Sequence, residues 1–139
     1  MMKKLDLPRD EMAIRKIYKK LVEQGKLTTV FRPGKRLCGD FRGYCPGEEI
    51  KLRIIDKTGA DWAMLPPEFI SDFIKLIEIE NIEALPLGKL ESKHFVGSSP
   101  DVQSKDDLIY QLGIIYNLEL ENLHDEALVT RITFKYKDC

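Results

Sequence analysis

The sequence predicts an α+β fold in which a small, curled, mostly antiparallel or mixed β-barrel carries flanking helices. First, residues 49–55 and 127–136 alternate apolar and polar side chains, the period of a half-buried strand. Second, residues 10–25 and 104–117 combine helix-capping residues with apolar side chains at helical spacing. Third, the connections vary in length and the strands are amphipathic, which disfavours a doubly wound parallel sheet with uniformly apolar strands.

The composition is that of one ordinary globular domain. The chain has 139 residues, 43% of them hydrophobic and 32% charged, with a formal net charge of −1. We expect a single domain over residues 1–139, with residues 1–9 as a loose lead-in. No apolar run approaches the roughly 18 residues needed to cross a bilayer, and the N-terminal residues are too polar for a secretory signal. A cytoplasmic location without a membrane partner is therefore expected, and the sequence specifies no oligomeric state.

The first element is predicted to be a helix from Asp10 to Gly25. Asp10 is a favourable N-cap, and Gly25 is a favourable residue just beyond a helix end. Between them, apolar side chains follow one helical face at Ile14, Ile17, Tyr18, Leu21 and Val22.

Strands are predicted at residues 28–32, 49–55 and 73–85, because β-branched residues or alternating patterns occupy these segments. Residues 39–47 contain three glycines and a proline and are predicted to form a loop. Residues 56–60 suggest a turn, and residues 62–69 suggest an irregular or short helical connection.

The last third is predicted to contain two helices and a strand. Pro86 suits the first turn of a short helix over residues 87–94. A polar loop over residues 97–101 follows. Ser104 and Asp107 then resemble a capping box that begins a helix reaching about Asn117. The final strand over residues 127–136 presents Leu128, Thr130, Ile132, Phe134 and Tyr136 on one face.

The cysteines are expected to be free thiols, because three cysteines in a cytosolic chain leave an odd count. Six residues separate Cys38 from Cys45, which is not a zinc-knuckle spacing, and the two histidines lie far away in sequence. We expect neither a metal site nor a cofactor, and Cys139 is expected to be an exposed thiol.

Positive charge concentrates early in the chain. Residues 26–42 contain one acid, Asp40, among five cations: Lys26, Arg32, Lys35, Arg36 and Arg42. Since the whole protein is nearly neutral, any nucleic-acid surface must be a local patch. Ordinary scatter of solvated surface charge is the alternative.

The segment Gly25-Lys26-Leu27-Thr28-Thr29-Val30-Phe31-Arg32, the later Gly47-Glu48-Glu49 turn and the order of the remaining elements resemble the ASCH family. These small barrels are related to the PUA domains that bind RNA. Members typically show a helix, then Gly-Lys-Lys-Thr-x-Thr-x-Arg or a near variant, and a Gly-Asp/Glu turn into a strand. The resemblance spans roughly residues 14–136 and implies a PUA-like barrel.

Some members with this pattern are amidohydrolases that deacetylate acetylcytidine with a lysine, a threonine and a later carboxylate. The resemblance places Leu27 and Val30 at the first two positions and Asp101 near the third, so two catalytic side chains are missing. A shift of one residue brings Lys26 and Thr29 into these roles, but such a shift in a strand reverses the face unless a bulge intervenes. The catalytic candidates are therefore Lys26, Thr29 and Asp101.

Binding does not need these catalytic groups. Lys26 and Arg32 offer fixed cations beside threonine hydroxyls, and arginine can hold a phosphate with two parallel bonds. Phe41, Tyr44 and Trp62 are candidates for stacking on a base, although Trp62 is the one that more often belongs to a core. The ligand-binding candidates are Lys26, Thr28, Arg32, Lys35, Arg36, Phe41, Arg42, Tyr44, Ser98 and Ser99.

Three functions remain open at this point. The first is an RNA- or nucleotide-binding domain that uses a basic cleft after the first helix. The second is a small hydrolase, either an amidohydrolase of the acetylcytidine type or a ribonuclease. The third is a protein-interaction domain whose basic loop meets an acidic partner. The structural alternative is that Thr28, Val30 and Arg32 only form one face of a strand.

Overall fold

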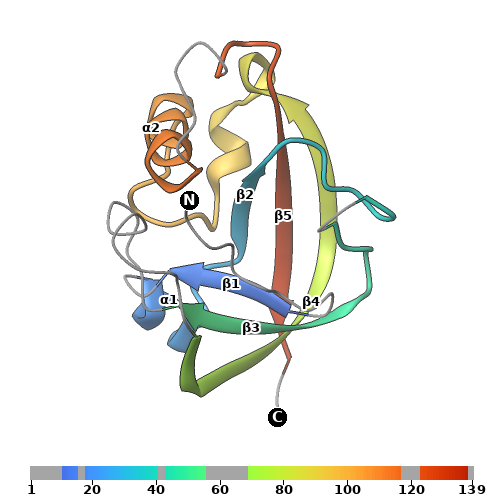
Figure 1. Cartoon of the computed structure of the whole chain (residues 1–139), viewed down its shortest axis with the longest axis vertical. Coiled ribbons are helices and arrows are strands. Elements are labelled where there is room, and N and C mark those ends of the chain that lie inside the picture. The colour runs from blue at the N-terminus through green and yellow to red at the C-terminus, as the bar shows by residue number, and fades with distance from the viewer. Residues whose placement is uncertain (1–10, 16–17, 41–42, 56–68, 117–122, 138–139) are drawn as a thin grey trace, which may run out of the picture.

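A computed structural model describes residues 11–15, 18–40, 43–55, 69–116 and 123–137. Within them lie five strands, two α-helices and two short 3₁₀ helices (Figure 1). In chain order they are β1 (Glu11–Arg15), α1 (Lys19–Glu23), β2 (Thr29–Pro33), β3 (Glu49–Ile55), β4 (Phe69–Pro86), η3 (Leu87–Lys89), η4 (Ser92–Phe95), α2 (Lys105–Tyr116) and β5 (Leu128–Tyr136).

The strands form one mixed, curled sheet in the order β1-β3-β4-β5-β2. Only β1 and β3 run parallel, and the other three pairs are antiparallel. The long strand β4 pairs with β3 through its first part and with β5 through its second part, with a register shift between Ile79 and Asn81. In Figure 1, β1 and β3 consequently run across one end of β5. The predicted mixed α+β sheet with flanking helices is confirmed, but β1 and β2 are two edges that do not pair in the described sheet, so barrel closure is not observed.

The predicted first helix is wrong over much of its length. Glu11–Arg15 is a strand, and only Lys19–Glu23 is α-helical. Met12 and Ile14 are both buried and lie two residues apart, as strand alternation requires. Ile14 also fits helical spacing with Tyr18, four residues later, and pairing of the segment with β3 decides between the two patterns.

The predicted stop at Gly25 is confirmed. Gly25 has φ +67°, and its N–H donates to the carbonyl of Val22 at 3.0 Å. The N–H of Lys26 donates to the carbonyl of Leu21 at 2.9 Å. These two bonds are those of a Schellman motif, in which the positive φ favours glycine.

Most other elements lie close to their predicted positions. β3 spans residues 49–55 as predicted, and β2, α2 and β5 begin within one residue of the expected starts. Ser104 accepts a bond from the N–H of Asp107, but the Asp107 carboxylate caps the N–H of Gln103 rather than that of Ser104. The predicted helix over residues 87–94 is instead the pair η3 and η4, because Leu90 and Glu91 are extended. The segments 56–60 and 62–68, with Trp62, lie outside the described residues.

Two hydrophobic cores lie on opposite faces of β2 and β5. Val30, Ile132 and Phe134 point into the core inside the curled sheet, which also contains side chains of α1, β1, β3 and β4. Phe31 and Val129 point the other way, into a second core beneath α2 and the 3₁₀ helices. The second core consists of Phe31, Leu87, Phe95, Val102, Leu108, Leu112, Leu123 and Val129. The last strand, β5, therefore contributes apolar side chains from its two faces to two different cores.

Side chains bridge the gap between the edge strands β1 and β2. Arg32 on β2 donates from Nη2 to the carbonyl of Ala13 on β1 at 2.9 Å, and from Nη1 to the carbonyl of Phe31 at 3.0 Å. The Tyr44 hydroxyl donates to the carbonyl of Glu11, also on β1, at 2.5 Å. We call these contacts the seam. They give hydrogen-bond donors to edge carbonyls that strand pairing leaves without partners.

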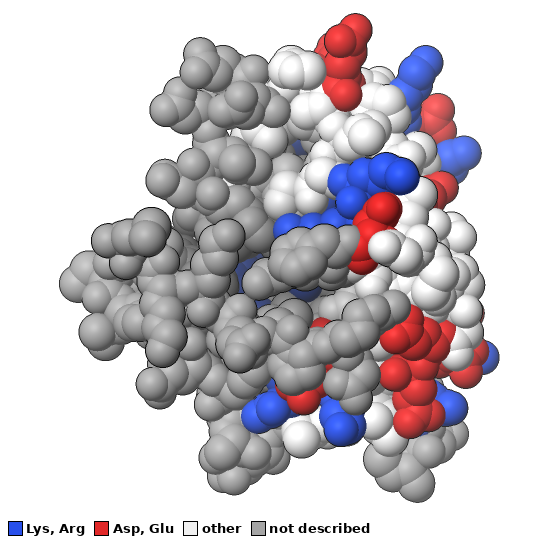
Figure 2. Space-filling model, turned by 45° about the vertical axis from the view of Figure 1, so that its right-hand side comes forward, with Lys and Arg blue, Asp and Glu red and all other residues white. Residues whose placement is uncertain are grey.

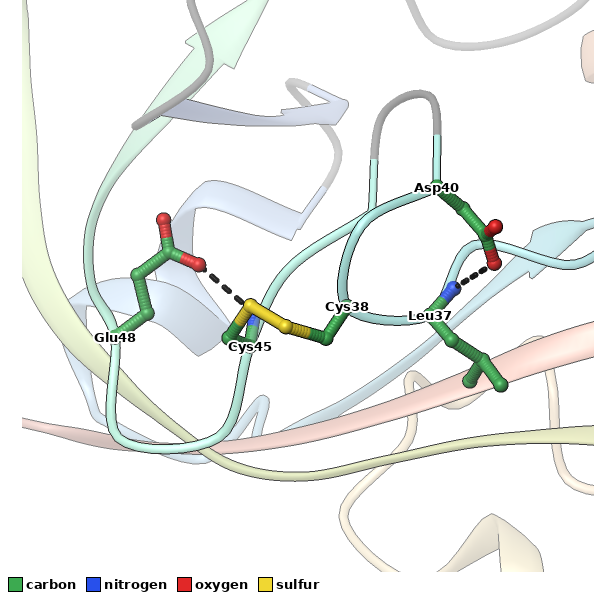
Figure 3. The surroundings of a disulfide bond; sticks show 5 residues. All are labelled: Leu37, Cys38, Asp40, Cys45 and Glu48. Atoms are coloured by element: carbon green, nitrogen blue, oxygen red, sulfur yellow. Dashed lines mark hydrogen bonds between the residues drawn. A yellow bond between two sulfur atoms is a disulfide. The ribbon is translucent and has the colours of Figure 1, made fainter.

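Cys38 and Cys45 are joined by a disulfide, so the expectation of free thiols is wrong for these two residues (Figure 3). Their Cα atoms lie 4.5 Å apart, within the range that a disulfide can bridge. Gly43 lies close against the segment before Cys38, since a Cβ on Gly43 would lie 2.0 Å from the carbonyl oxygen of Leu37. An odd number of cysteines shows only that the cysteines cannot all be paired within the chain. It does not exclude a disulfide between two of them, and here a local reversal of the chain brings Cys38 and Cys45 together. We call residues 34–48 the disulfide loop.

The seam predicts a specific cost for losing the Arg32 guanidinium. Arg32→Met keeps the apolar stem but removes both donated bonds, and hydrogen bonds from charged groups contribute about 1.5–3 kcal/mol. We expect the free energy of unfolding to fall by about 2 kcal/mol in urea denaturation. Lys26→Met, at an exposed position, is the matched control and should change stability by less than about 0.5 kcal/mol. Equal effects of the two substitutions would show that the Arg32 bonds in the seam do not stabilise the fold.

Candidate functional site

The start of β2 is held against the loop that precedes α2. The N–H groups of Thr28 and Thr29 both donate to the carbonyl of Gly97, at 2.9 and 3.1 Å. The Thr29 hydroxyl donates to the carbonyl of Val96 at 2.7 Å, and Thr29 is buried. Gly97 has φ +83°, and a Cβ there would lie 2.2 Å from the Thr28 hydroxyl oxygen. Only glycine allows this approach of the two segments.

A polar cluster lies next to this junction. Asp101 accepts a hydrogen bond from Ser99 Oγ at 2.8 Å. The Tyr18 hydroxyl faces both Asp101 oxygens, at 2.6 and 2.7 Å. Arg15 donates to the Tyr18 hydroxyl, and its Nη2 lies 3.8 Å from Asp101 Oδ2. We call Arg15, Tyr18, Ser99 and Asp101 the polar cluster. Three of its members are buried and Asp101 is partly exposed, so it presents one carboxylate edge to the surface.

The phenol of Tyr18 stays protonated in this cluster. Burial, and then the hydrogen bond to Asp101, raise the pKa of Tyr18 from 10.0 to about 12. Burial disfavours the phenolate because a charge loses its hydration there, and the carboxylate accepts a bond that only the protonated phenol donates. Tyr18 therefore acts as a hydrogen-bond donor at neutral pH.

The three catalytic candidates do not form a set of mutual contacts. Asp101 contacts Tyr18, Ser99 and Arg15, and the Thr29 hydroxyl donates to a backbone carbonyl. The Lys26 side chain is exposed and has no ion pair with a described residue. A nucleophilic hydroxyl needs a neighbouring base, and the atom that Thr29 contacts is a carbonyl oxygen.

The binding candidates separate into two groups along β2. Thr28, Ser98 and Ser99 lie at its start, beside Gly97. Lys35 and Arg36 follow its end, where the N–H of Arg36 donates to the hydroxyl of Thr130 on β5. The hydroxyl groups and the exposed Lys26 thus lie near the start of β2, and further cations follow its end.

Lys35 and Arg36, the cations that follow β2, lie in the disulfide loop. Lys35 Nζ lies 3.7 Å from Asp40 Oδ2, with 57% of the lysine side chain exposed. The same Asp40 oxygen accepts a bond from the N–H of Leu37 at 2.9 Å. Tyr44 is 6% exposed and packs in the first core, which leaves its ring unavailable for stacking in this conformation. Phe41 and Arg42 lie outside the described residues.

Sequence reasoning missed Arg15 and Tyr18. Both were assigned to a helix, with Tyr18 on its apolar face. A tyrosine, unlike a leucine, carries a hydroxyl that needs a partner when buried, and an arginine three residues earlier was a possible donor. That signal did not identify Asp101, 83 residues away from Tyr18, as the acceptor.

Comparison with solved structures shows which known folds this chain resembles. Protein EF3133 from Enterococcus faecalis V583, of the family DUF984, matches with a TM-score of 0.54 at 13% identity, over 86% of this chain and 69% of that chain. The ASCH domain from Lactobacillus crispatus JV V101 matches with a TM-score of 0.51 at 13% identity, over 86% of this chain and 70% of that chain. The fold is ASCH-like. No family model and no curated protein sequence matches the chain.

The ASCH-like fold agrees with the resemblance drawn from the sequence. At such low identity the agreement concerns the fold alone. Gly25 and Arg32 of the motif both have clear structural roles here, one at a helix end and one in the seam. Leu27, at the position of a catalytic lysine in the family, is 2% exposed and lies in the first core.

The described segments contain neither a candidate metal centre nor a candidate membrane span. No group of three or more His, Cys, Asp or Glu in these segments is arranged to hold a metal ion. No helix in the described part of the chain has the length and apolar character needed to span a bilayer.

Charges of both signs lie side by side on the face drawn in Figure 2. Ion pairs also join neighbouring strands of the sheet, such as Lys135 with Glu78 at 3.5 Å and Arg131 with Glu83 at 3.3 Å. Partly exposed pairs of this kind contribute little stability, but each cancels part of the field that an unpaired cation would produce.

Gly97→Ala tests the junction between β2 and the loop. The Cβ collides with Thr28 in addition to straining a positive φ, which alone costs about 1–2 kcal/mol. Gly34→Ala is the matched control, because Gly34 has φ +78° but no atom within 4 Å of its Cβ. We expect Gly97→Ala to lower the free energy of unfolding by about 1 kcal/mol more than Gly34→Ala does, in denaturant titration. A smaller effect at Gly97 than at Gly34 would contradict the close approach.

The raised pKa of Tyr18 predicts how stability changes in alkali. The folded state holds the phenolic proton more tightly than the unfolded state, so this stabilisation is complete below pH 10 and is lost as pH rises toward 12. Stability measured by urea denaturation should fall over this interval in the wild type and fall less in Tyr18→Phe. Burial also raises the pKa of Tyr136, so Tyr136→Phe serves to separate the two contributions. Parallel pH profiles for wild type and Tyr18→Phe would show that Tyr18 titrates normally.

Proposed function

We propose that this chain binds single-stranded RNA through the surface along β2, from Lys26 to Arg36. The observation that carries the proposal is the ASCH-like fold, because the ASCH family is related to PUA domains that bind RNA. β2 is the strand that carries the motif segment, and exposed cations lie beyond both of its ends.

The cations support a phosphate-directed contact. Lys26 is exposed at the start of β2, and Lys35 is exposed beyond its end. Ammonium groups at these places can neutralise two separate phosphates of one RNA strand without reading sequence. The Arg36 side chain is half-buried and lies next to Lys35. Arg32 contributes indirectly, because its guanidinium donates two bonds within the seam.

Hydroxyl groups beside Gly97 suit contacts to the RNA sugars. Thr28 and Ser98 are partly exposed, whereas Thr29 and Ser99 are buried. A 2′-hydroxyl is both a donor and an acceptor, so serine and threonine hydroxyls match it. The carboxylate of Asp101 is partly exposed, and its negative charge disfavours a phosphate beside it.

We do not extend the proposal to hydrolysis. The Thr29 hydroxyl contacts a carbonyl oxygen, and Asp101 receives bonds from Tyr18 and Ser99. Leu27 and Val30, at the family's catalytic positions, are buried apolar residues.

Salt-dependent binding tests the proposal. Fluorescence anisotropy with a labelled RNA of about ten nucleotides, long enough to cover both ends of β2, measures the dissociation constant at several salt concentrations. Removing one cation that neutralises a phosphate should reduce the slope of log K against log[salt] by about 0.7 for a single strand. We expect Lys26→Gln and Lys35→Gln each to weaken binding and to lower that slope.

Lys105→Gln is the matched control, since it removes one charge from α2, where Lys105 pairs with Asp125 at 2.9 Å. Absence of binding at low salt, or equal effects of all three substitutions, would reject the proposal. Full competition by a free nucleoside monophosphate would identify a nucleotide, rather than the RNA chain, as the ligand.

A further inference from the structure

The Cys38–Cys45 disulfide connects two anchored parts of the disulfide loop. The first part is anchored on β5, because the N–H of Gly34 donates to the carbonyl of Leu128 at 2.9 Å. The second part is anchored on β4, where the N–H of Gly47 donates to the carbonyl of Ile79 at 2.7 Å. The covalent bond therefore fixes the distance between segments that different strands hold.

Each half of the loop also has its own turn. Asp40 closes the first turn by accepting the N–H of Leu37, and Glu48 closes the second by accepting the N–H of Cys45 at 2.8 Å (Figure 3). These contacts are local, within three residues of each other in sequence. The N–H of Gly43 also donates to the carbonyl of Asp40 at 2.9 Å, so a backbone hydrogen bond joins the two turns beside the disulfide. Breaking the disulfide leaves both turns and this bond in place and makes movement of one turn relative to the other easier.

Tyr44 links the loop to the seam. It directly precedes Cys45, its ring is buried in the first core, and its hydroxyl donates to the carbonyl of Glu11 on β1. Glu11 also pairs through its carboxylate with Arg53 on β3 at 3.2 Å. A change in the position of Cys45 is therefore transmitted through one residue to the edge of the sheet.

The disulfide is accessible to reagents on the side of Cys38. Cys38 is exposed and Cys45 is half-buried. An incoming thiolate therefore reaches the sulfur of Cys38 more readily, which makes Cys45 the leaving group.

We propose that this disulfide is a redox switch that controls the shape of the seam and of the cationic end of β2. The partner is a dithiol reductant. Its first thiolate attacks Cys38 Sγ, and the S–S bond breaks to give a mixed disulfide and the Cys45 thiolate. Its second thiolate then attacks the reductant's own sulfur in the mixed disulfide and releases the Cys38 thiolate. The reductant becomes a disulfide, and its two protons are taken up by the cysteine thiolates.

The oxidised form holds the cations for binding. Lys35 pairs with Asp40, and Asp40 lies two residues from Cys38, so the bond restrains the segment that carries Lys35. Restraint before binding lowers the entropy cost of binding. We therefore expect oxidised protein to bind RNA more tightly than reduced protein, a statement that rests on the proposed function.

Amide hydrogen exchange tests the switch without reference to RNA. All samples carry Cys139→Ser, so that Cys38 and Cys45 are the only cysteines. Reduction with dithiothreitol should accelerate exchange about tenfold or more at residues 34–40, 43–48 and 11–15, because local opening becomes easier. Cys38→Ser should resemble the reduced form and should not respond to the dithiol. Exchange rates that are unchanged by reduction would overturn the proposal.

Tyr44→Phe separates the link from the loop. It retains the ring but removes the bond to the carbonyl of Glu11. Oxidised Tyr44→Phe should already show fast exchange at β1, and reduction should then accelerate the loop while adding little at β1. An undiminished effect of reduction on β1 in this variant would overturn the role of Tyr44.

RNA affinity of the oxidised and reduced forms completes the test. We expect reduction to weaken binding about threefold or more. Equal affinity in both forms would overturn control of the binding site. If exchange responds to reduction and neither form binds RNA, the proposed function fails while the conformational switch stands.

Discussion

A curled sheet that does not close by strand pairing must satisfy the polar groups on its two facing edges by other means. Arg32 and Tyr44 meet this requirement by donating to the carbonyls of Ala13 and Glu11 on β1. Arg32 belongs to the motif segment and Tyr44 to the disulfide loop that follows it, so two consecutive segments join the two edges of the sheet. Edge carbonyls without a donor cost stability, so these two side chains help to keep the first core enclosed.

The fold class could be predicted from the sequence because strand alternation and helix caps are local signals. β3, α2 and the Gly25 helix end depend on neighbours within a few residues, and all three were predicted correctly. β1 was missed because Ile14 continues the helical spacing of Tyr18, Leu21 and Val22, whereas the strand depends on pairing with β3, which is distant in sequence. The disulfide was missed because an odd cysteine count says nothing about which two residues a loop brings together.

The candidate site was predictable in parts. The threonines meet the loop at Gly97 and Ser99 meets Asp101 in the polar cluster, whereas Lys35 and Arg36 follow the opposite end of β2. The tertiary contact of Tyr18 with Asp101 has no local signature, so the polar cluster emerges only in three dimensions. The hydrogen bonds within the polar cluster make Asp101 part of a structural network. Surface cations, rather than acid–base groups, are therefore the more suitable candidates for contact with a ligand.

The strand order also determines when the elements can assemble. β3 and β4 follow one another along the chain, but Thr29 of β2 pairs with Thr133 of β5, more than a hundred residues later. Closing so long a stretch of chain is entropically slow, and pairings of this kind delay folding. On a ribosome, β2 has no strand partner until residues 128–136 have emerged, so the motif-bearing segment waits for nearly the whole remainder of the described chain before the sheet can bury it.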